Sequence, residues 1–248
     1  MSLDGRRALV TGGGTGLGAS LARCFAAAGA EVVVCGRRPE PLQAIAASTS
    51  GVRAIVADVT DEAQVAALYR DAGHVDIIVA NAGAARSAPL HRTTLELWNE
   101  MLAANLSGAF LTLRDGYAQL RNSDWGRLIT VASTAGLRGY AYVAAYTAAK
   151  HGAVGLTRAI AAEVQGSGIT ANALCPGYLD TEMTDRTVDN IVATTGRTRE
   201  QAVAALAADN PQGRLIDPGE VARVALALCL PGREQVNGAA LEIDGTDW

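Results

Sequence analysis

Short apolar runs rich in β-branched residues alternate along the whole chain with longer segments of helical periodicity. Apolar runs bounded by turn residues predict strands, here at Ala8–Thr11, Glu31–Cys35, Val52–Ala57, Val75–Ala80, Arg127–Ala132, Ile169–Leu174 and Ala239–Ile243. Several runs are apolar at nearly every position, as burial on both faces of a parallel sheet requires. The pattern therefore predicts an α/β fold, a doubly wound parallel sheet with helices on both faces.

The segments between the strands carry helix start and stop signals. Gly29 favours the end of a first helix that runs from about Gly16 to Ala28. Pro39 suits the first turn of a second helix, and Asp61 can cap a third. These signals support regular alternation of strand and helix.

One stretch departs from this alternation. Residues 178–214 are polar and helical and follow Pro176-Gly177. An insertion there would lie over the carboxyl ends of the strands, where such sheets bind ligands. The chain shows no Pro/Ser-rich linker and no internal repeat, so we expect a single domain over residues 1–248, with a substrate lid at about 178–214.

Composition and charge exclude several classes of protein. The chain is 49% hydrophobic and 19% charged, with 27 Gly against 7 Pro, which is globular rather than disordered. A net charge of −4 disfavours nucleic acid and anionic membranes as partners. The longest apolar runs, such as Val224–Leu230, are far shorter than the roughly 20 residues that span a bilayer.

The N-terminal residues and the cysteines indicate a reducing compartment. Met1–Arg7 reaches charged residues at once, without the apolar stretch of a signal peptide. Four cysteines lack Cys-x-x-Cys spacing and lie in apolar surroundings, which is typical of reduced thiols; they are Cys24, Cys35, Cys175 and Cys229. We expect a cytoplasmic protein without a metal site.

A glycine-rich stretch, Thr11-Gly12-Gly13-Gly14-Thr15-Gly16-Leu17-Gly18, follows the first strand and opens the first helix. Glycines let the backbone approach a pyrophosphate, and the helix offers free N–H groups and the positive end of its dipole. The spacing Gly12-xxx-Gly16-x-Gly18 differs from the common fingerprint, although Gly14-x-Gly16-x-x-Ala19 fits its alanine variant. The position of the loop predicts a Rossmann-type dinucleotide site rather than a plain turn.

The end of the second strand bears on cofactor choice. An acidic residue there binds the ribose hydroxyls of NAD, but this chain reads Cys35-Gly36-Arg37-Arg38. Guanidinium groups suit a 2′-phosphate, so we expect NADP(H) in preference to NAD(H). A solvated arginine pair beside Pro39 is the alternative. Asp58 could meet the adenine amino group or be an ordinary turn residue.

The basic residues are 20 arginines and a single lysine, Lys150. This lysine lies four residues after Tyr146 in Tyr146-Thr147-Ala148-Ala149-Lys150, on the same face of a predicted helix. A phenol of pKa about 10 is a poor acid-base catalyst at neutral pH, and a nearby cation stabilises its phenolate. Lysine, unlike arginine, can also pass on a proton. The pair therefore indicates proton-transfer chemistry.

Together these motifs resemble the short-chain dehydrogenase/reductase superfamily over nearly the whole chain. The resemblance is carried by Thr11–Gly18, Asn81-Ala82-Gly83, Ser133, Tyr146-xxx-Lys150 and Pro176-Gly177, in that order, with 13 residues from Ser133 to Tyr146. Ala80 stands where the family has the first Asn of Asn-Asn-Ala-Gly. The resemblance implies a nicotinamide-dependent enzyme that interconverts a carbonyl and a secondary alcohol.

The resemblance also implies a role for each catalytic residue. Tyr146 would be the general acid in reduction and the base in oxidation. Lys150 would lower the pKa of Tyr146 and hold the nicotinamide ribose. Ser133 would hydrogen-bond the substrate oxygen as charge develops on it, and Asn105 would anchor a water in the proton relay. Singly, these residues could be a half-buried tyrosine, a strand-end serine and a helix-interior asparagine.

Further contacts follow from the same resemblance. Asn81 would tie the sheet to the adenosine side, whereas Leu179 and Thr181 would lie near the nicotinamide carboxamide. Taken with the loop and the arginine pair, it places cofactor contacts at Gly12, Thr15, Gly16, Leu17, Arg37, Arg38, Asp58, Val59, Asn81, Ala82, Gly83, Tyr146, Lys150, Pro176, Gly177, Leu179 and Thr181. It places substrate contacts at Ser133, Tyr140, Tyr142, Tyr146 and Gly177.

The substrate is less defined than the reaction. Val131–Lys150 resembles 3-oxoacyl thioester reductases, including polyketide ketoreductases, so a carrier-protein or CoA thioester, or a similar ketone, is the first hypothesis. Arg186, Arg197 and Arg199 could meet a phosphate of that carrier or form a solvated helix face. A polyol or sugar-acid dehydrogenase, and a dinucleotide-sensing protein without turnover, are the alternatives; an intact proton relay argues against a sensor.

The family resemblance further implies a homotetramer. Its subunits would pair through long helices at about 95–120 and 146–165 and through the C-terminal strand.

Overall fold

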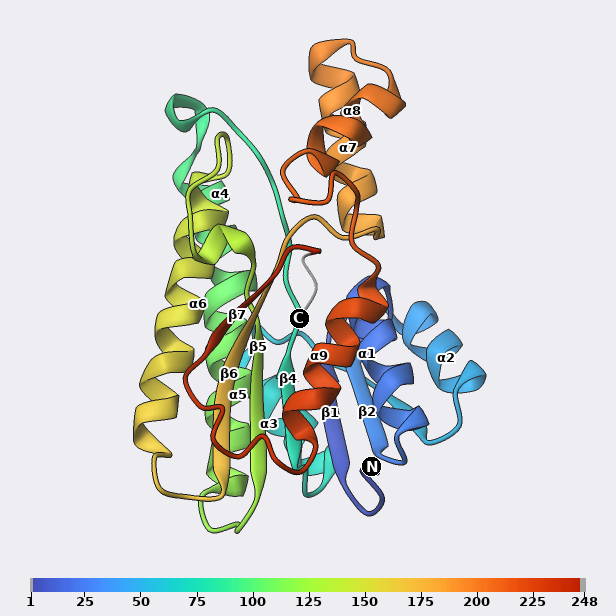
Figure 1. Cartoon of the computed structure of the whole chain (residues 1–248), viewed down its shortest axis with the longest axis vertical. Coiled ribbons are helices and arrows are strands. Elements are labelled where there is room, and N and C mark those ends of the chain that lie inside the picture. The colour runs from blue at the N-terminus through green and yellow to red at the C-terminus, as the bar shows by residue number, and fades with distance from the viewer. Residues whose placement is uncertain (1, 246–248) are drawn as a thin grey trace.

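Seven parallel strands form one sheet in a computed structural model that describes residues 2–245 (Figure 1). Their order across the sheet is β3-β2-β1-β4-β5-β6-β7. The strands are β1 (Arg7–Thr11), β2 (Glu31–Gly36), β3 (Val52–Val56), β4 (Ile77–Ala80), β5 (Gly126–Val131), β6 (Ile169–Pro176) and β7 (Ala240–Ile243). The predicted doubly wound α/β fold is confirmed. Strand ends differ from the predictions by at most two residues.

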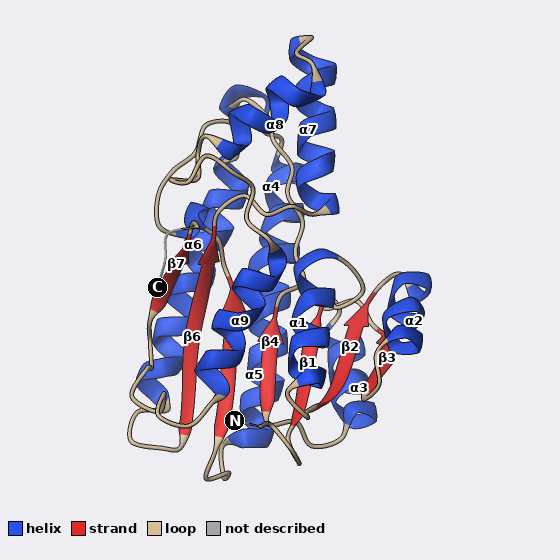
Figure 2. Cartoon of the chain, turned by 45° about the vertical axis from the view of Figure 1, so that its right-hand side comes forward, coloured by secondary structure: helices blue, strands red, loops and turns tan. Residues whose placement is uncertain are grey.

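Helices cover both faces of the sheet (Figure 2). One layer holds α1 (Gly16–Ala27), α2 (Pro39–Ser48) and α9 (Pro218–Cys229), and the other holds α3 (Glu62–Ala72), α5 (Gly108–Leu120) and α6 (Ala144–Glu163). The order of the strands reverses between β1 and β4. Sheets of this kind bind ligands outside the carboxyl ends of the strands at such a switch point.

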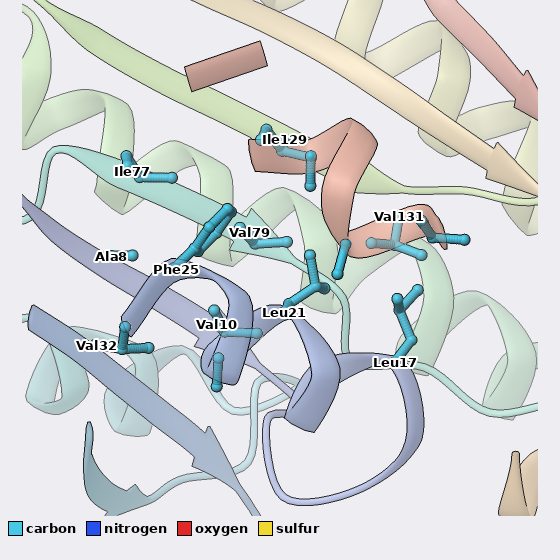
Figure 3. Close-up of a cluster of buried hydrophobic side chains, with 14 of the residues drawn as sticks. Ala8, Val10, Leu17, Leu21, Phe25, Val32, Ile77, Val79, Ile129 and Val131 are labelled. Carbon is cyan, nitrogen blue, oxygen red and sulfur yellow. The ribbon is translucent and has the colours of Figure 1, made fainter. Parts of the chain in front are cut away.

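Successive residues of one strand enter different cores. Val10 packs under α1 in the core drawn in Figure 3, together with Leu21 and Phe25. Leu9, its neighbour in β1, enters the second core under α3 and α5. Both Leu9 and Val10 are 0% exposed, which explains why the middle of β1 is continuously apolar rather than alternating.

The residues predicted to start or end helices do so in the structure. The Asp61 carboxylate accepts hydrogen bonds from the N–H groups of Ala63 and Gln64 and caps α3, and α2 begins at Pro39. Gly29 follows α1 with φ +95°, in the left-handed region that glycine enters without a steric cost.

The continuous helix predicted over 95–120 is wrong. The chain forms α4 (Leu95–Leu102), a π-helix (Ala103–Ser107) and then α5. The Asn105 side chain explains the interruption, because its Nδ2 donates to the carbonyl oxygen of Met101 at 3.0 Å. In an α-helix that carbonyl would receive the Asn105 backbone N–H. The long helix predicted over 146–165 is α6, which begins two residues earlier.

Residues 178–214 contain two helices, α7 (Glu182–Thr195) and α8 (Arg199–Ala207), which stand above the carboxyl ends of the strands (Figures 1 and 2). A small core of Val188, Ala202 and Leu206 holds them together. Their base is fixed where Leu179 pairs with Ile216 in a parallel bridge. Within residues 2–245, no helix has the length and apolar character needed to cross a membrane.

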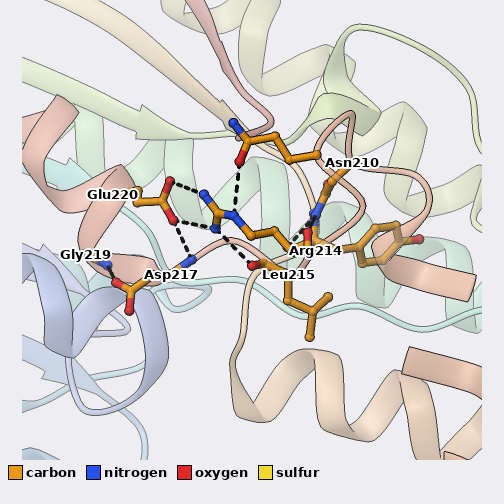
Figure 4. Close-up of polar contacts among 8 residues, drawn as sticks. Asn210, Arg214, Leu215, Asp217, Gly219 and Glu220 are labelled. Atoms are coloured by element: carbon orange, nitrogen blue, oxygen red, sulfur yellow. Dashed lines mark hydrogen bonds and ion pairs between the residues drawn. The ribbon is translucent and has the colours of Figure 1, made fainter. Parts of the chain in front are cut away.

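The chain returns from α8 to the sheet through a polar junction (Figure 4). Buried Asn210 donates to the carbonyl oxygens of Tyr178 and Arg214 and accepts from the Tyr178 N–H. Arg214 donates to both carboxylate oxygens of Glu220, at 2.7 and 2.9 Å. Glu220 also accepts from the Asp217 N–H and completes the capping box that starts α9. The junction therefore fixes where the segment re-enters the fold.

Candidate active site

The glycine-rich loop is shaped so that side chains would collide. Gly12 has φ +64°, and a Cβ atom there would lie 2.9 Å from the Cα of Ala82. A Cβ on Gly18 would lie only 2.1 Å from the carbonyl oxygen of Gly12. The backbone is thus a bare cradle beside the switch point, as a pyrophosphate requires.

The start of α1 completes this cradle. Gly16 has φ +50°, and Leu17 is buried in the core. Within the described residues, Thr15 makes no side-chain capping bond and the first turn of α1 carries no acidic group. Free N–H groups and the positive end of the helix dipole favour an anion. The residues present therefore fit a dinucleotide phosphate.

Asn81 joins the two strands at the switch point. Its Nδ2 donates to the Thr11 carbonyl oxygen at 2.8 Å, and the N–H groups of Asn81 and Ala82 both donate to the Thr11 hydroxyl at 3.0 Å. The end of β4 is thereby held against the start of the glycine loop. Substitution of Ala80 for the family's first asparagine leaves this connection intact.

The two arginines after β2 have different partners. The Arg37 side chain is 76% exposed, and its Nη1 lies 4.0 Å from Oδ2 of Asp58. Arg38 donates to both carboxylate oxygens of Glu182, at 3.3 and 3.1 Å. Asp58 accepts from the N–H and hydroxyl of Thr60, which is the behaviour of a turn residue. The acid that pairs with Arg38 thus comes from α7, a contact that the sequence did not predict.

Ser133, Tyr146 and Lys150 come together where β5 ends and α6 begins. The Tyr146 phenol is hydrogen-bonded by the Ser133 side chain. The Lys150 Nζ lies 5.6 Å from the centroid of the Tyr146 ring and donates to the Val131 carbonyl oxygen at 2.8 Å. The spacing of four residues on α6 thus places both side chains beside the end of β5.

Burial controls the ionisation of this cluster. Lys150 is 4% exposed, and loss of hydration lowers its pKa to about 8. Burial raises the pKa of Tyr146, and the hydrogen bond from Ser133 opposes that change. The family resemblance predicts that Lys150 lowers the pKa of Tyr146, whereas in this structure burial and the Ser133 hydrogen bond are what shift that pKa. The phenol is therefore protonated at neutral pH.

Asn105 reaches the site from the π-helix. Its side chain accepts from the Ala84 N–H at 3.2 Å and donates to the Ala84 carbonyl oxygen at 2.8 Å. Gly83 lies between this amide and Lys150, because a Cβ there would be 2.6 Å from the Asn105 Oδ1 and 3.8 Å from the Lys150 Nζ. Asn105, Gly83 and Lys150 are therefore neighbours.

Aromatic residues form a wall beside Tyr146. The rings of Tyr140 and Tyr178 meet edge to face, with centroids 6.4 Å apart. The Tyr140 hydroxyl donates to Thr134 at 2.9 Å and accepts from Arg138 at 3.0 Å. Burial raises the pKa of Tyr178 to about 12. Predicted Tyr140 is thus part of the wall, while Tyr178 was missed because it shares no sequence pattern with Tyr140.

Tyr142 lies at the same loop in a strained conformation. It is the one non-glycine residue among 2–245 with positive φ, at +68°, and its side chain is exposed. Its carbonyl oxygen accepts from the Ala88 N–H at 2.8 Å. Such backbone outliers are concentrated at functional sites.

Gly177 and Pro176 link the sheet to the segment above it. The Gly177 N–H donates to the Ile243 carbonyl oxygen, and a Cβ there would be 2.2 Å from the Asn210 Oδ1. Thr181 approaches the cradle, since a Cβ on Gly16 would lie 3.2 Å from its methyl group. Val59 packs against Gly108 at the start of α5.

A hollow of about 490 Å³ lies at the opposite end of β6, lined by residues that include Gln165, Thr170 and Glu234. It is remote from Tyr146, because Ile169 and Thr170, which line it, lie at the start of the strand whose other end approaches the cluster. We assign the chemistry to the Tyr146 cluster, where acid, cation and cradle converge.

The chain matches the short chain dehydrogenase family over residues 6–192. It belongs to that family. As a short-chain dehydrogenase it is an oxidoreductase acting on CH–OH and C=O groups. Curated relatives include D-beta-hydroxybutyrate dehydrogenase of Cupriavidus necator, which is 37% identical over 252 residues and 98% of each chain.

Two solved structures extend the comparison. A variant of actinorhodin polyketide ketoreductase with NADPH has a TM-score of 0.91 and 33% identity, over 99% of this chain and 98% of that one. A putative NAD(P)-dependent gluconate 5-dehydrogenase from Beutenbergia cavernae with bound NADP has a TM-score of 0.87 and 36% identity, over 98% and 97%. This short-chain dehydrogenase is therefore similar to proteins acting on quite different substrates.

Proposed function

We propose that this short-chain dehydrogenase transfers hydride between NADP(H) and a carbonyl/secondary-alcohol pair, and that its substrate is a 3-oxoacyl thioester or a similar ketone. The observation that carries the proposal is the convergence of Ser133, Tyr146 and Lys150 beside the glycine cradle. A bound nicotinamide would supply or accept the hydride at this point.

The residues divide the proton chemistry between them. The Tyr146 phenol, protonated at neutral pH, gives its proton to the carbonyl oxygen during reduction and takes one back during oxidation. The Ser133 oxygen accepts from the Ala135 N–H at 3.1 Å, and its single proton, which meets Tyr146 in this structure, would turn to the substrate oxygen when substrate is bound. Two donors thus meet the oxygen on which negative charge develops.

Lys150 and Asn105 would assist the transfer of protons between Tyr146 and solvent. The Lys150 ammonium, with its pKa lowered to about 8, can lose and regain a proton near neutral pH. Asn105 would hold a water on the path from Lys150 to solvent. Its amide is already oriented by Ala84 and Met101, which fixes the direction of its free oxygen lone pair.

The arginine pair supports NADP(H) over NAD(H). Arg37 and Arg38 stand at the end of β2, beside the cradle, where the Cys35 carbonyl oxygen accepts from the Gly13 N–H. Arg37→Asp is expected to weaken NADPH binding at least tenfold while changing NADH binding about twofold or less, since a bidentate charge contact is worth about 1.5–3 kcal/mol. Equal losses for both cofactors would contradict this placement.

The substrate class rests on the ketoreductase similarity and on the aromatic wall. Comparing turnover of acetoacetyl-CoA with turnover of a gluconate-type sugar acid tests it directly. The sugar-acid alternative is supported by similarity to the gluconate 5-dehydrogenase, and faster turnover of the sugar acid would favour it. In the part of the chain that is described, Arg186 and Arg199 already pair with lid acids, which weakens their assignment to a carrier phosphate.

Tyr146→Phe separates an enzyme from a dinucleotide-sensing protein. The variant is expected to bind cofactor normally and to lose at least 100-fold in kcat, because general acid catalysis contributes about 10²–10⁴-fold. Normal binding with unchanged turnover would favour the sensor.

We also propose that residues 178–214 act as a substrate lid on a single domain, with Leu179 and Thr181 near the nicotinamide carboxamide. The homotetramer and the cytoplasmic location remain predictions. Light scattering of the purified chain at several concentrations measures the assembly directly.

A further inference from the structure

The first turn of α7 reaches back over the adenosine end of the predicted cofactor site. Thr181 approaches the glycine cradle at Gly16, and the next residue, Glu182, grips Arg38 through two hydrogen bonds. These residues are 144 positions apart in the chain. The same segment therefore touches both the phosphate cradle and an arginine assigned to the 2′-phosphate.

The charges around this contact favour exchange of partners. Glu182 holds a second guanidinium, because its Oε1 accepts from Arg186 at 2.5 Å. The negative charge of Glu40, at the start of α2, also attracts Arg38 and helps to raise its pKa. If Arg38 left Glu182, the carboxylate would keep Arg186, so neither charge would be stranded.

Separating Arg38 from Glu182 costs little free energy, because both side chains are exposed to solvent. The side chains of Arg38 and Glu182 are 53% and 44% exposed, and ion pairs of this exposure contribute little to stability. A 2′-phosphate carries nearly two negative charges and offers several acceptor oxygens. The 2′-phosphate would therefore displace the Glu182 carboxylate from the Arg38 guanidinium. Breaking that ion pair would reduce the net affinity for NADP(H).

We propose that Glu182 is a determinant of cofactor specificity, which competes with the 2′-phosphate for Arg38 and so limits the preference for NADP(H). The inference rests on the proposed placement of the 2′-phosphate at the arginine pair. Glu182 acts through Arg38 and is a positioning residue. Binding of NADP(H) would release the first turn of α7 from the β2–α2 junction, whereas NAD(H) would leave this contact in place.

The test uses two probes that differ only in the 2′-phosphate, adenosine 2′,5′-bisphosphate and adenosine 5′-monophosphate. Their dissociation constants are measured by calorimetry at low salt for the full chain and for Glu182→Gln. Removing the competing charge is expected to tighten the bisphosphate about two- to fivefold, the equivalent of one exposed ion pair. The monophosphate should be unchanged.

Two controls define the cause. Asp185→Asn removes the same charge from the same turn of α7, but Asp185 pairs with Arg199 instead, so both probes should bind as before. In an Arg38→Met background, Glu182→Gln should have no effect. Melting temperatures of all variants show whether each is folded.

Several results would overturn the inference. These are an equal change for both probes, the same gain in Asp185→Asn, persistence of the gain without Arg38, or no gain in folded Glu182→Gln. The proposed cofactor preference is judged separately, by the wild-type ratio of the two dissociation constants. Suppose that the wild-type protein binds both probes equally well and Glu182→Gln prefers the bisphosphate. This result would overturn the proposed wild-type preference for NADP(H) and support the role of Glu182.

Discussion

The Nζ of Lys150 donates a hydrogen bond to the Val131 carbonyl oxygen at 2.8 Å, with the side chain almost entirely withdrawn from water. Loss of hydration on burial lowers the pKa of Lys150 from 10.5 to about 8. Between these values the unfolded chain binds the proton and the folded chain does not, so stability rises as pH increases from 8 to 10.5. The cost is fully present below pH 8 and amounts to at most about 3 kcal/mol.

Lys150→Met is therefore expected to raise the free energy of unfolding at pH 7 while it abolishes turnover. The gain should be about 1–2 kcal/mol, because the unpaired Val131 carbonyl oxygen offsets part of it. It should shrink as pH rises from 8 to 10, where the wild-type lysine is neutral in the folded state. Urea denaturation at several pH values measures this, and a variant less stable than the wild type at pH 7 would refute it.

Ser133→Ala should shift the pH dependence of alcohol oxidation. The Ser133 hydrogen bond lowers the pKa of Tyr146 against the effect of burial, so its loss raises that pKa. The rise of kcat/KM for oxidation with pH should move upward by about half to one pH unit. Thr147→Ala is the control, because the adjacent Thr147 hydroxyl is buried and unpartnered within the described chain. An unmoved profile in Ser133→Ala would contradict the role of Ser133.

Two glycines, one in α1 and one in α6, give opposite predictions. Gly18→Ala places a Cβ 2.1 Å from the Gly12 carbonyl oxygen, so we expect loss of cofactor binding and about 1–3 kcal/mol of destabilisation. Gly155 lies exposed in α6, with open space where the methyl group of an alanine would stand. Gly155→Ala should stabilise the protein by up to about 1 kcal/mol with unchanged cofactor affinity. Thermal melting and cofactor titration of both variants decide the matter.

Tyr142→Asn should make the protein more stable and weaken its binding of substrate. Asparagine tolerates the left-handed backbone that tyrosine adopts here at φ +68°, so relief of strain should add about 0.5–1 kcal/mol. KM for the ketone should rise if the tyrosine forms part of the substrate wall. Tyr140→Phe, which keeps its ring at ordinary φ, should show no such gain. A Tyr142→Asn protein of lower stability would speak against stored strain.

The sheet was predictable because its physical cause is local. Several strands are apolar at nearly every position because both faces are buried, as Leu9 and Val10 show by entering opposite cores. The Tyr146–Lys150 pair was predictable for the same reason, since four residues on a helix bring two side chains to one face. Fixed positions relative to strand ends then brought Ser133 and the glycine loop into the site.

Contacts between distant segments could not be predicted in this way. Asn105 has the sequence surroundings of an ordinary helical residue, and only its bonds to Ala84 and Met101 reveal why the helix changes register. No residue near Arg38 in the sequence indicates that its side chain pairs with Glu182. The ionisation of Tyr146 likewise depends on how completely the folded protein excludes water, which a sequence pattern does not specify.

A π-helix accommodates one residue more than the α-helical turn it replaces. Deleting any single residue from 103–107 would let α4 and α5 merge into one uniform rod. Because the wider turn already absorbs the extra residue, α4 and α5 would keep their orientation, but the carbonyl oxygen of Met101 would take a backbone donor and the amide of Asn105 would leave the Ala84 loop. The spacing of this segment is thus as critical as its chemistry: a change in length that regularises the helix would dismantle the site it supports.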